Sequence, residues 1–191
     1  DNRLIEIIEL TESDFKTLKT IRDQTAHGNP VKTLQEHNIT HEMTLTDKLS
    51  LIIHYCISMD FGISTDEFIK SLGQTTHPAS RGARINRDKI YKFDDSVLKI
   101  KISAKDYQAT NKANFPYMVF TSTDDEYHLD IAASETTREF GNRGVSNHIC
   151  DFLSETLNIK RSRIQYHSII HVTSEENEKS IHGCCTVSKI N

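Results

Sequence analysis

The spacing of apolar residues changes partway along the chain, and this change limits the folds that the sequence can form. Up to about residue 75, apolar residues recur every three or four positions, as in "TLTDKLSLIIHYCISMDFG", which is typical of helices. From about residue 97, segments such as "SVLKIKIS" alternate apolar and polar residues, which is typical of half-buried strands. The sequence therefore predicts an α+β protein, with a helical unit over residues 1–75 and a small α+β accessory or regulatory region over 76–191.

The helical part is expected to contain three helices. Ser13 can cap the first, which ends at "HGNP", where Gly28 and Pro30 prevent continuation. Ser64 and Glu67 have the spacing of a capping box at the start of a short third helix. The second helix presents a wide apolar stripe, predicted to pack beneath the first helix: Leu45, Leu49, Ile52, Ile53, Cys56 and Ile57.

The turn-rich stretch "TTHPASRGARINRDK" separates these helices from the second region. Beyond it, strands are expected in "SVLKIKIS", "PYMVFTS", "EYHLDIA", "SRIQYHSIIHV" and "IHGCCTVSKI". One helix is expected in "NRGVSNHICDFLSETLNI", where Val145, Ile149, Phe152 and Leu153 lie on one face. This mixture is what assigns the region to the α+β class.

The composition of the chain limits the classes of function that it can have. The chain has 191 residues, 36% of them hydrophobic and 26% charged, with a net charge of -4, as in ordinary soluble globular proteins. A mildly acidic chain is not a strongly basic nucleic-acid platform, although a small cationic site can lie on an acidic body. No stretch approaches the ~20 apolar residues of a membrane span. Four cysteines without a disulfide-like framework favour a reducing, cytoplasmic location, with no membrane partner.

The stretch "TIRDQTAHGNP" carries the strongest chemical signal. Arg22 and His27 are separated by four residues, and Asp23 directly follows the arginine. On a regular helix the arginine and histidine lie about 140° apart, so convergence requires a loosened helix end or a second copy of the motif. Histidine can transfer protons near neutral pH, and arginine can hold a phosphate with its planar guanidinium group. The pair suits phosphodiester cleavage without metal, and the alternative is a polar surface helix end.

The same segment resembles the HEPN superfamily, whose ribonuclease members carry an arginine, then Asn, Asp or His, three further residues and a histidine. "RDQTAH" matches each position, and the following "HGN", polar connector and apolar helix are similar to ApeA-type abortive-infection HEPN proteins. The resemblance covers residues 1 to about 75. It implies an all-α core that dimerises and cleaves RNA without metal or other cofactor. By this match Arg22 holds phosphate, His27 transfers protons and Asp23 is the accompanying polar group.

A weaker resemblance concerns the C-terminal region. "LSETLNIKRSRIQYH" and its surroundings are similar to a strand–helix–strand unit of the tautomerase (macrophage migration inhibitory factor) superfamily. Those enzymes use an N-terminal proline as base. Pro30, Pro78 and Pro116 are internal amides in this chain, so we expect no tautomerase chemistry. The resemblance implies instead an oligomerisation region.

Two further clusters remain. "RGARINRDK" places Arg81, Arg84 and Arg87 close together, and this cluster either contributes phosphate contacts beside the motif or is a solvated loop. Histidines and cysteines also recur late in the chain, and a zinc site formed by two strands is conceivable, with His167 and His171 sharing one strand face and His182 and Cys184 another. Ordinary satisfied or solvated side chains are favoured over a metal there.

The sequence thus predicts a metal-independent endoribonuclease of the toxin or phage-defence kind, acting on RNA as a homodimer or larger homo-oligomer. An antitoxin or regulatory partner would control it. The alternative is a non-catalytic assembly or binding protein, in which HEPN-like helices dimerise and the C-terminal region oligomerises.

Overall fold

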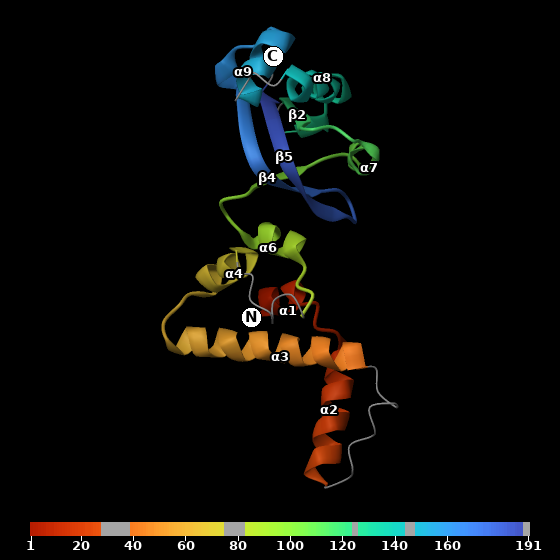
Figure 1. Ribbon diagram of the computed structural model, residues 1–191, viewed down its shortest axis with the longest axis vertical. Coiled ribbons are helices and arrows are strands. Elements are labelled where there is room, and N and C mark those ends of the chain that lie inside the picture. The colour runs from red at the N-terminus through yellow and green to blue at the C-terminus, as the bar shows by residue number, and fades with distance from the viewer. Residues whose placement is uncertain (28–38, 75–82, 124–125, 144–147, 189–191) are drawn as a thin grey trace. The chain divides into compact units, whose positions relative to one another are not determined.

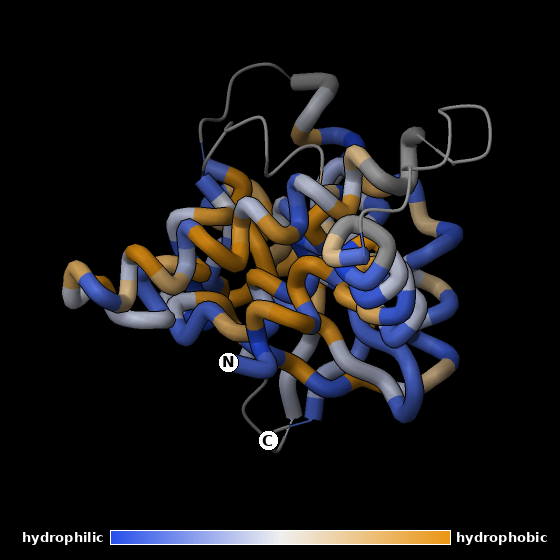
Figure 2. The backbone as a smooth tube through the Cα atoms, turned by 90° about the horizontal axis from the view of Figure 1, so that it is seen from below, coloured by the Kyte–Doolittle hydropathy of each residue, from blue (hydrophilic) through white to orange (hydrophobic). Residues whose placement is uncertain are grey.

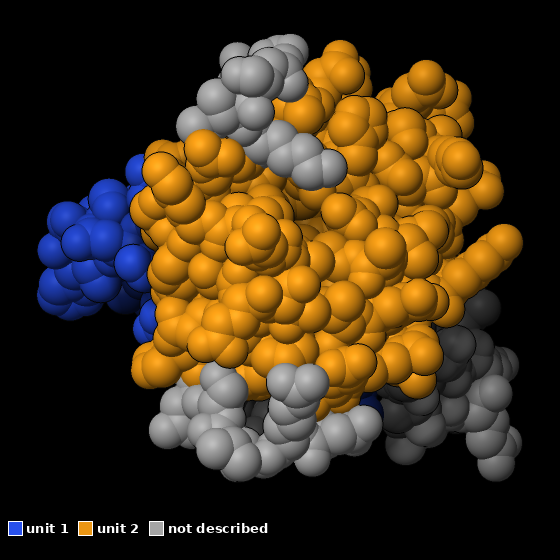
Figure 3. Space-filling view, turned by 90° about the horizontal axis from the view of Figure 1, so that it is seen from above, with its two compact units in different colours: residues 1–94 blue, residues 95–191 orange. Residues whose placement is uncertain are grey.

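The computed structural model describes residues 1–27, 39–74, 83–123, 126–143 and 148–188, and it confirms the α+β class. The chain divides into two compact units, residues 1–94 and 95–191, coloured separately in Figure 3. The boundary follows Asp94, well beyond residue 75, because residues 83–94, which include the end of the turn-rich stretch, join the helical unit. The backbone N–H of Asn86 donates to the carbonyl of Ile7 at 2.7 Å, which ties this segment to the first helix.

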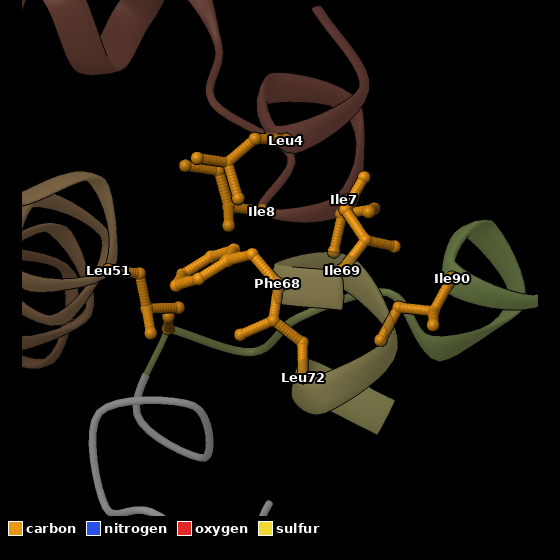
Figure 4. Packing of buried hydrophobic residues seen from close by; sticks show 9 residues of the cluster. Leu4, Ile7, Ile8, Leu51, Phe68, Ile69, Leu72 and Ile90 are labelled. Atoms are coloured by element: carbon orange, nitrogen blue, oxygen red, sulfur yellow. The ribbon is translucent and has the colours of Figure 1, made fainter. Parts of the chain in front are cut away.

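Unit 1 consists of helices, most of which pack around one small core (Figure 1). Its elements are α1 (Asn2–Ile7), α2 (Glu12–Ala26), α3 (Ile39–Asp60), α4 (Thr65–Gln74) and α6 (Arg87–Phe93). Apolar side chains of α1 and α4 point toward one another and toward single residues of α3 and α6, as Figure 4 shows. These are Leu4, Ile7, Ile8, Leu51, Phe68, Ile69, Leu72 and Ile90.

Helix α3 buries a different face from the one predicted. Leu45 is buried as expected, and so is Leu51, which is outside the predicted stripe. Ile53 and Ile57, both in the stripe, are 57% and 47% exposed, and Cys56 is also exposed. The packing partners in α1 and α4 meet the Leu51 side, which leaves Ile53 and Ile57 outside the core. Figure 2 shows the apolar and polar residues along each helix. The apolar pattern identified the helix correctly but not its buried side, because it was apolar over too wide an arc.

The capping residues predicted for α2 and α4 can be compared with the hydrogen bonds at the start of each helix. The prediction that Ser13 caps α2 is wrong, because Thr11 forms the reciprocal pair. The Thr11 backbone N–H donates to the Asp14 carboxylate at 2.8 Å, and the Asp14 N–H donates to the Thr11 hydroxyl at 3.2 Å. The capping box predicted for α4 is confirmed, with the Ser64 N–H donating to the Glu67 carboxylate at 2.9 Å.

Unit 2 is built on a mixed sheet of five strands in the order β1-β4-β5-β2-β3. The strands are β1 (Leu98–Lys101), β2 (Met118–Thr123), β3 (Glu126–Leu129), β4 (Ile164–Thr173) and β5 (Glu178–Ser188). Every strand lies within a segment predicted from alternation or overlaps one. The central pair is antiparallel, with Ile164 opposite Val187 and Ile170 opposite Ile181, whereas β1 and β2 run parallel to their neighbours in the centre.

Helices pack on the sheet through two separate apolar clusters. The helical elements are α7 (Ala104–Lys112), α8 (Ile131–Arg143), α9 (Ile149–Leu157) and the short 3-10 turn η1 (Arg161–Arg163). Val119 belongs to the cluster that includes Leu153 of α9, and its neighbour Phe120 belongs to the cluster beside α7. Consecutive strand residues thus enter different cores, as alternation requires. Helices α7 and α8 were not predicted, and α8 begins at Ile131, inside a segment predicted as a strand. The α7 sequence "AKDYQATNK" is mostly polar, and Ser103 caps this helix by accepting from the Asp106 N–H at 3.1 Å.

Candidate functional site

The motif residues lie on the last turn of α2 and directly after it. Arg22 is exposed, with 72% of its side chain accessible, and His27 is exposed immediately beyond the helix. The backbone N–H of His27 donates to the carbonyl of Asp23 at 3.1 Å, which continues the helical hydrogen bonding past Ala26. Both functional side chains can therefore be reached from solvent.

Arg22 forms an ion pair with the adjacent Asp23. The guanidinium Nη2 and Nε donate to the same carboxylate oxygen, Oδ1, at 2.7 and 3.0 Å. Asp23 is itself 45% exposed, so water screens the pair and its net contribution is on the order of 0–1 kcal/mol. A phosphate could replace this carboxylate at little cost, because both offer oxygens to the same planar donor.

Helix α2 is held to its unit near its beginning. Among the α2 residues whose side chains the structure describes, only Asp14 is buried, whereas Phe15 is 52% exposed and Ile21 is 37% exposed. The Lys48 ammonium of α3 lies 3.1 Å from the Asp14 carboxylate and donates to the carbonyl of Glu9 at 2.8 Å. The motif is thus carried on a helix whose final turns contribute little to the core.

The Asp14 environment favours the ionised carboxylate. Burial, the largest effect, would raise the pKa of Asp14, but hydrogen bonds from the Thr11 N–H and from Lys48 outweigh it. The pKa of Asp14 therefore lies below its usual value. Sequence reasoning overlooked this anchor, although two signals were visible: Thr11 and Asp14 have capping-box spacing, and Lys48 interrupts the apolar stripe of α3.

The basic cluster is only partly described. Arg81 lies outside the described residues, and Arg84 and Arg87 are both exposed. Their segment is fastened to α1 and to the residues that follow it, since the Asn86 side chain accepts from the Asp88 N–H and donates to Glu9 at 2.8 Å. Within one chain these arginines lie beside α1, whereas Arg22 and His27 lie at the far end of α2 (Figure 1). The structure does not bring the two groups together within one chain.

The late histidines and cysteines have separate environments. His167 Nε2 lies 3.1 Å from the Thr186 hydroxyl, and the buried His171 ring lies 3.3 Å from the Ser180 hydroxyl through Nδ1 and 3.5 Å from Glu178 through Nε2. His182 is exposed whereas Cys184 is fully buried, and Gly183 between them adopts φ +68°, so these two do not share an environment as regular alternation predicted. In the described part of the chain, no three His, Cys, Asp or Glu side chains are grouped as metal ligands.

The proline that lies in the described region has no titratable amine of the kind that tautomerases use, because it is inside the chain. Pro116 is exposed and precedes β2, and Pro30 and Pro78 lie outside the described residues. The described helices also include none with the length and apolar character needed to cross a membrane.

Comparison with known proteins adds no relative. No family model, no curated protein and no solved structure matches this chain.

Proposed function

We propose that the helical unit is a metal-independent endoribonuclease of the HEPN type, acting in the cytoplasm as a toxin or phage-defence enzyme. The observation that supports this best is the exposure of Arg22 and His27 together at the end of α2, with only an exposed carboxylate on the guanidinium. Phosphate can approach each side chain from solvent without disturbing the core, and because helical hydrogen bonding continues to His27, the two converge on one phosphate only with a second chain. Control by an antitoxin or other regulatory partner forms part of this proposal.

The chemistry needs one cation and two proton transfers. Arg22 holds the scissile phosphate and neutralises charge that develops on it. One histidine accepts the proton of the ribose 2′-hydroxyl, whose oxygen attacks phosphorus, and a protonated histidine donates to the departing 5′-oxygen. The products are a 2′,3′-cyclic phosphate and a 5′-hydroxyl. One chain supplies a single His27, so two copies are required for separate acid and base.

The exposure of α2 agrees with such pairing. An isolated helix of about 15 residues is marginally stable in water, and in folded proteins it depends on tertiary packing. Here the described side chains of α2 bury only Asp14, while Phe15 and Ile21 remain exposed. A second α2 packed across a two-fold axis would cover these apolar side chains and bring two copies of the motif together.

Substitutions at the motif test the proposal. His27→Ala and Arg22→Ala should each lower RNA cleavage, by about 10²- to 10⁴-fold for the histidine, while leaving the circular dichroism spectrum unchanged. Arg22→Lys should rescue poorly, because a point charge replaces the planar fork. Lys19→Ala removes another exposed cation of α2 and is the matched control. Undiminished cleavage by His27→Ala would refute the assignment, as would a strict requirement for divalent metal.

Mixing two inactive variants tests whether the site is shared. If the active site contains groups from both chains, His27→Ala chains mixed with Arg22→Ala chains should regain a small part of the activity. A hybrid pair contains one intact arginine and one intact histidine, and water replaces the missing second histidine in proton transfer at a lower rate. Product ends should carry cyclic phosphate, and excess chelator should not stop the reaction. A strictly monomeric, fully active enzyme by light scattering would contradict the shared site.

A second candidate is a non-catalytic assembly protein, and the surface of α3 favours it. Ile53, Ile57 and Phe61 are four positions apart and are 57%, 47% and 83% exposed, which forms an apolar row on one side of the helix. In this case the α+β unit would provide a further oligomerisation surface. Ile57→Asp should then dissociate the oligomer in sedimentation experiments, whereas Thr46→Asp, an exposed position of the same helix, should not.

A further inference from the structure

Unit 2 contains a cavity that the proposed RNA cleavage does not use. Its volume is about 300 Å³, at the small end of the range for ligand sites. The lining comes from four elements of the unit and the residue before β2: Tyr117, Phe140 of α8, His148 and Cys150 at the start of α9, Arg161 of η1 and Tyr166 of β4. A cavity of this size suits a ligand no larger than a single nucleotide.

The walls of the cavity are aromatic. The rings of Tyr117 and Phe140 meet edge to face with centroids 5.8 Å apart, and those of Tyr117 and Tyr166 do so at 6.2 Å. Phe140 also contacts Phe152 of the core at 5.6 Å, which supports the wall from behind. Tyr166 is 50% exposed, so its ring remains available for stacking by a flat ligand.

Arg161 lines the cavity, and we call it and its chain neighbours Lys160 and Arg163 the basic rim. Arg161 Nε donates to Asp151 at 2.6 Å and Nη1 donates to the Ile164 carbonyl at 2.8 Å. These two bonds fix the guanidinium and leave its Nη2 without a protein acceptor among the described residues. Lys160 directly precedes η1 and Arg163 ends it; neither lines the cavity, and neither has a carboxylate partner in the described part of the chain. Asp151 therefore balances only one of three closely spaced cations.

Flat aromatic walls beside a basic rim are the combination with which proteins hold unpaired nucleotides, since bases stack on aromatic rings and cations neutralise the phosphate. We propose that this cavity binds one nucleotide, with its base stacked on Tyr166 and its phosphate held by Lys160 and the Nη2 edge of Arg161. The nucleotide is either a free mononucleotide or an unpaired residue of an RNA strand. This site is independent of RNA cleavage by the helical unit.

Binding measurements on the full-length chain test this site. All variants carry His27→Ala, so that cleavage cannot consume the probe. The probes are AMP and UMP by titration calorimetry, a fluorescein-labelled oligouridine of eight residues by anisotropy, and an RNA hairpin without unpaired ends. Tyr166→Ala should weaken binding about 5- to 150-fold, the effect of one lost base–aromatic stack. Tyr166→Phe keeps the ring and should bind within twofold of the parent.

The basic rim is tested separately. Lys160→Glu should weaken binding and lower the slope of log K against log salt by about 0.7 for the oligonucleotide. Lys105→Glu, at an exposed position of α7, makes the same charge change away from the cavity and should have little effect. If Tyr166→Ala loses its native circular dichroism spectrum, Lys160→Glu and its salt slope decide the question alone.

The probes distinguish the two sources. Saturable binding of AMP or UMP that depends on Tyr166 identifies a free nucleotide, and binding confined to the oligouridine identifies an unpaired RNA residue. The proposal is overturned if no probe binds, if Tyr166→Ala binds as tightly as Tyr166→Phe, or if Lys160→Glu and Lys105→Glu are alike. A preference for the hairpin over the oligouridine would also overturn it, because a duplex cannot place a base in the cavity.

Discussion

Replacing Lys48 by methionine should detach the helix that carries the motif. The substitution keeps an unbranched apolar side chain but removes the ammonium that lies 3.1 Å from Asp14 and donates to the Glu9 carbonyl at 2.8 Å. Asp14, only 3% exposed, would then be a buried carboxylate without its cation. The protein relieves this either by separating α2 from the core, which lets water reach the carboxylate, or by protonating Asp14, and both cost stability.

The size of the effect follows from two lines of reasoning. Removing one partner of a buried ion pair costs about 3–5 kcal/mol. Lys48 donates two hydrogen bonds, one to a charged group, and bonds of this kind contribute about 1–3 kcal/mol each, which gives a similar total. The expected loss of about 3–5 kcal/mol is a large part of the 5–15 kcal/mol that stabilises a typical domain.

The assay must report on α2, because the two units can unfold separately. Hydrogen exchange of the α2 backbone, residues 12–26, measured by mass spectrometry, should accelerate by about two orders of magnitude or more. Urea unfolding followed by circular dichroism should show a lower midpoint for unit 1. Lys16→Met breaks an exposed pair with Glu12 and is the control, expected to change stability by less than about 0.5 kcal/mol.

A double substitution separates the charge effect from the packing effect. Asp14→Leu combined with Lys48→Met replaces the ion pair by apolar side chains, and should recover most of the lost stability, because the uncompensated charge is gone. A free energy of unfolding for Lys48→Met within 1 kcal/mol of the parent, or an α2 that exchanges no faster, would contradict the anchoring role of Lys48. So would a double variant as unstable as Lys48→Met alone.

Three further predictions concern acid, backbone strain and thiols. Because the folded pKa of Asp14 lies below its unfolded value of about 3.9, its stabilising effect is complete above that pH and is lost as pH falls through the folded pKa. The protection factors of α2 amides, which compare exchange with the intrinsic rate at the same pH, should therefore fall below about pH 4. Arg84 adopts φ +53°, so Arg84→Gly should stabilise unit 1 by up to about 1 kcal/mol in urea unfolding; if Arg84 contacts phosphate, RNA affinity should fall at the same time. Burial raises the pKa of the Cys184 thiol to about 12 and also raises that of Cys185, so a thiol reagent at pH 8 should modify only the exposed Cys56 in the native protein and all four cysteines after unfolding. Rapid native labelling of more than one thiol would contradict the burial of the others.

Local sequence rules located most elements of both units. Alternation and short apolar runs identified all five strands. The half-buried β1 alternates, whereas β2 and β5 contain consecutive buried residues because both faces of the sheet pack against apolar clusters. The capping box of Ser64 and Glu67 marked the start of α4, because its two hydrogen bonds join residues three positions apart. Helix α7 was missed because its polar sequence carries no apolar period, and its position depends on a cap and on contacts with the sheet.

The candidate site was predictable in its residue types but not in its surroundings. The spacing of Arg22, Asp23 and His27 was readable from the sequence, and so was the helix that carries them. The Arg22–Asp23 ion pair and the exposure of both functional side chains depend on which face of α2 is covered. The aromatic cavity of unit 2 was not predicted, because its lining comes from positions as far apart as Tyr117 and Tyr166.

By itself, the sequence determined the α+β class, the strands, the helices α2, α3, α4 and α9, and the chemical types available at the motif. These features depend on interactions between residues a few positions apart, and the spacing of such residues can be recognised in the sequence. The tertiary structure decided which face of α3 is buried, that the segment up to Asp94 belongs to the helical unit, and that Lys48 anchors Asp14. In each case the sequence offers several residues of similar polarity that could be buried or paired. Which of them are buried depends on contacts with segments distant in the sequence, because burial is a property of the whole unit.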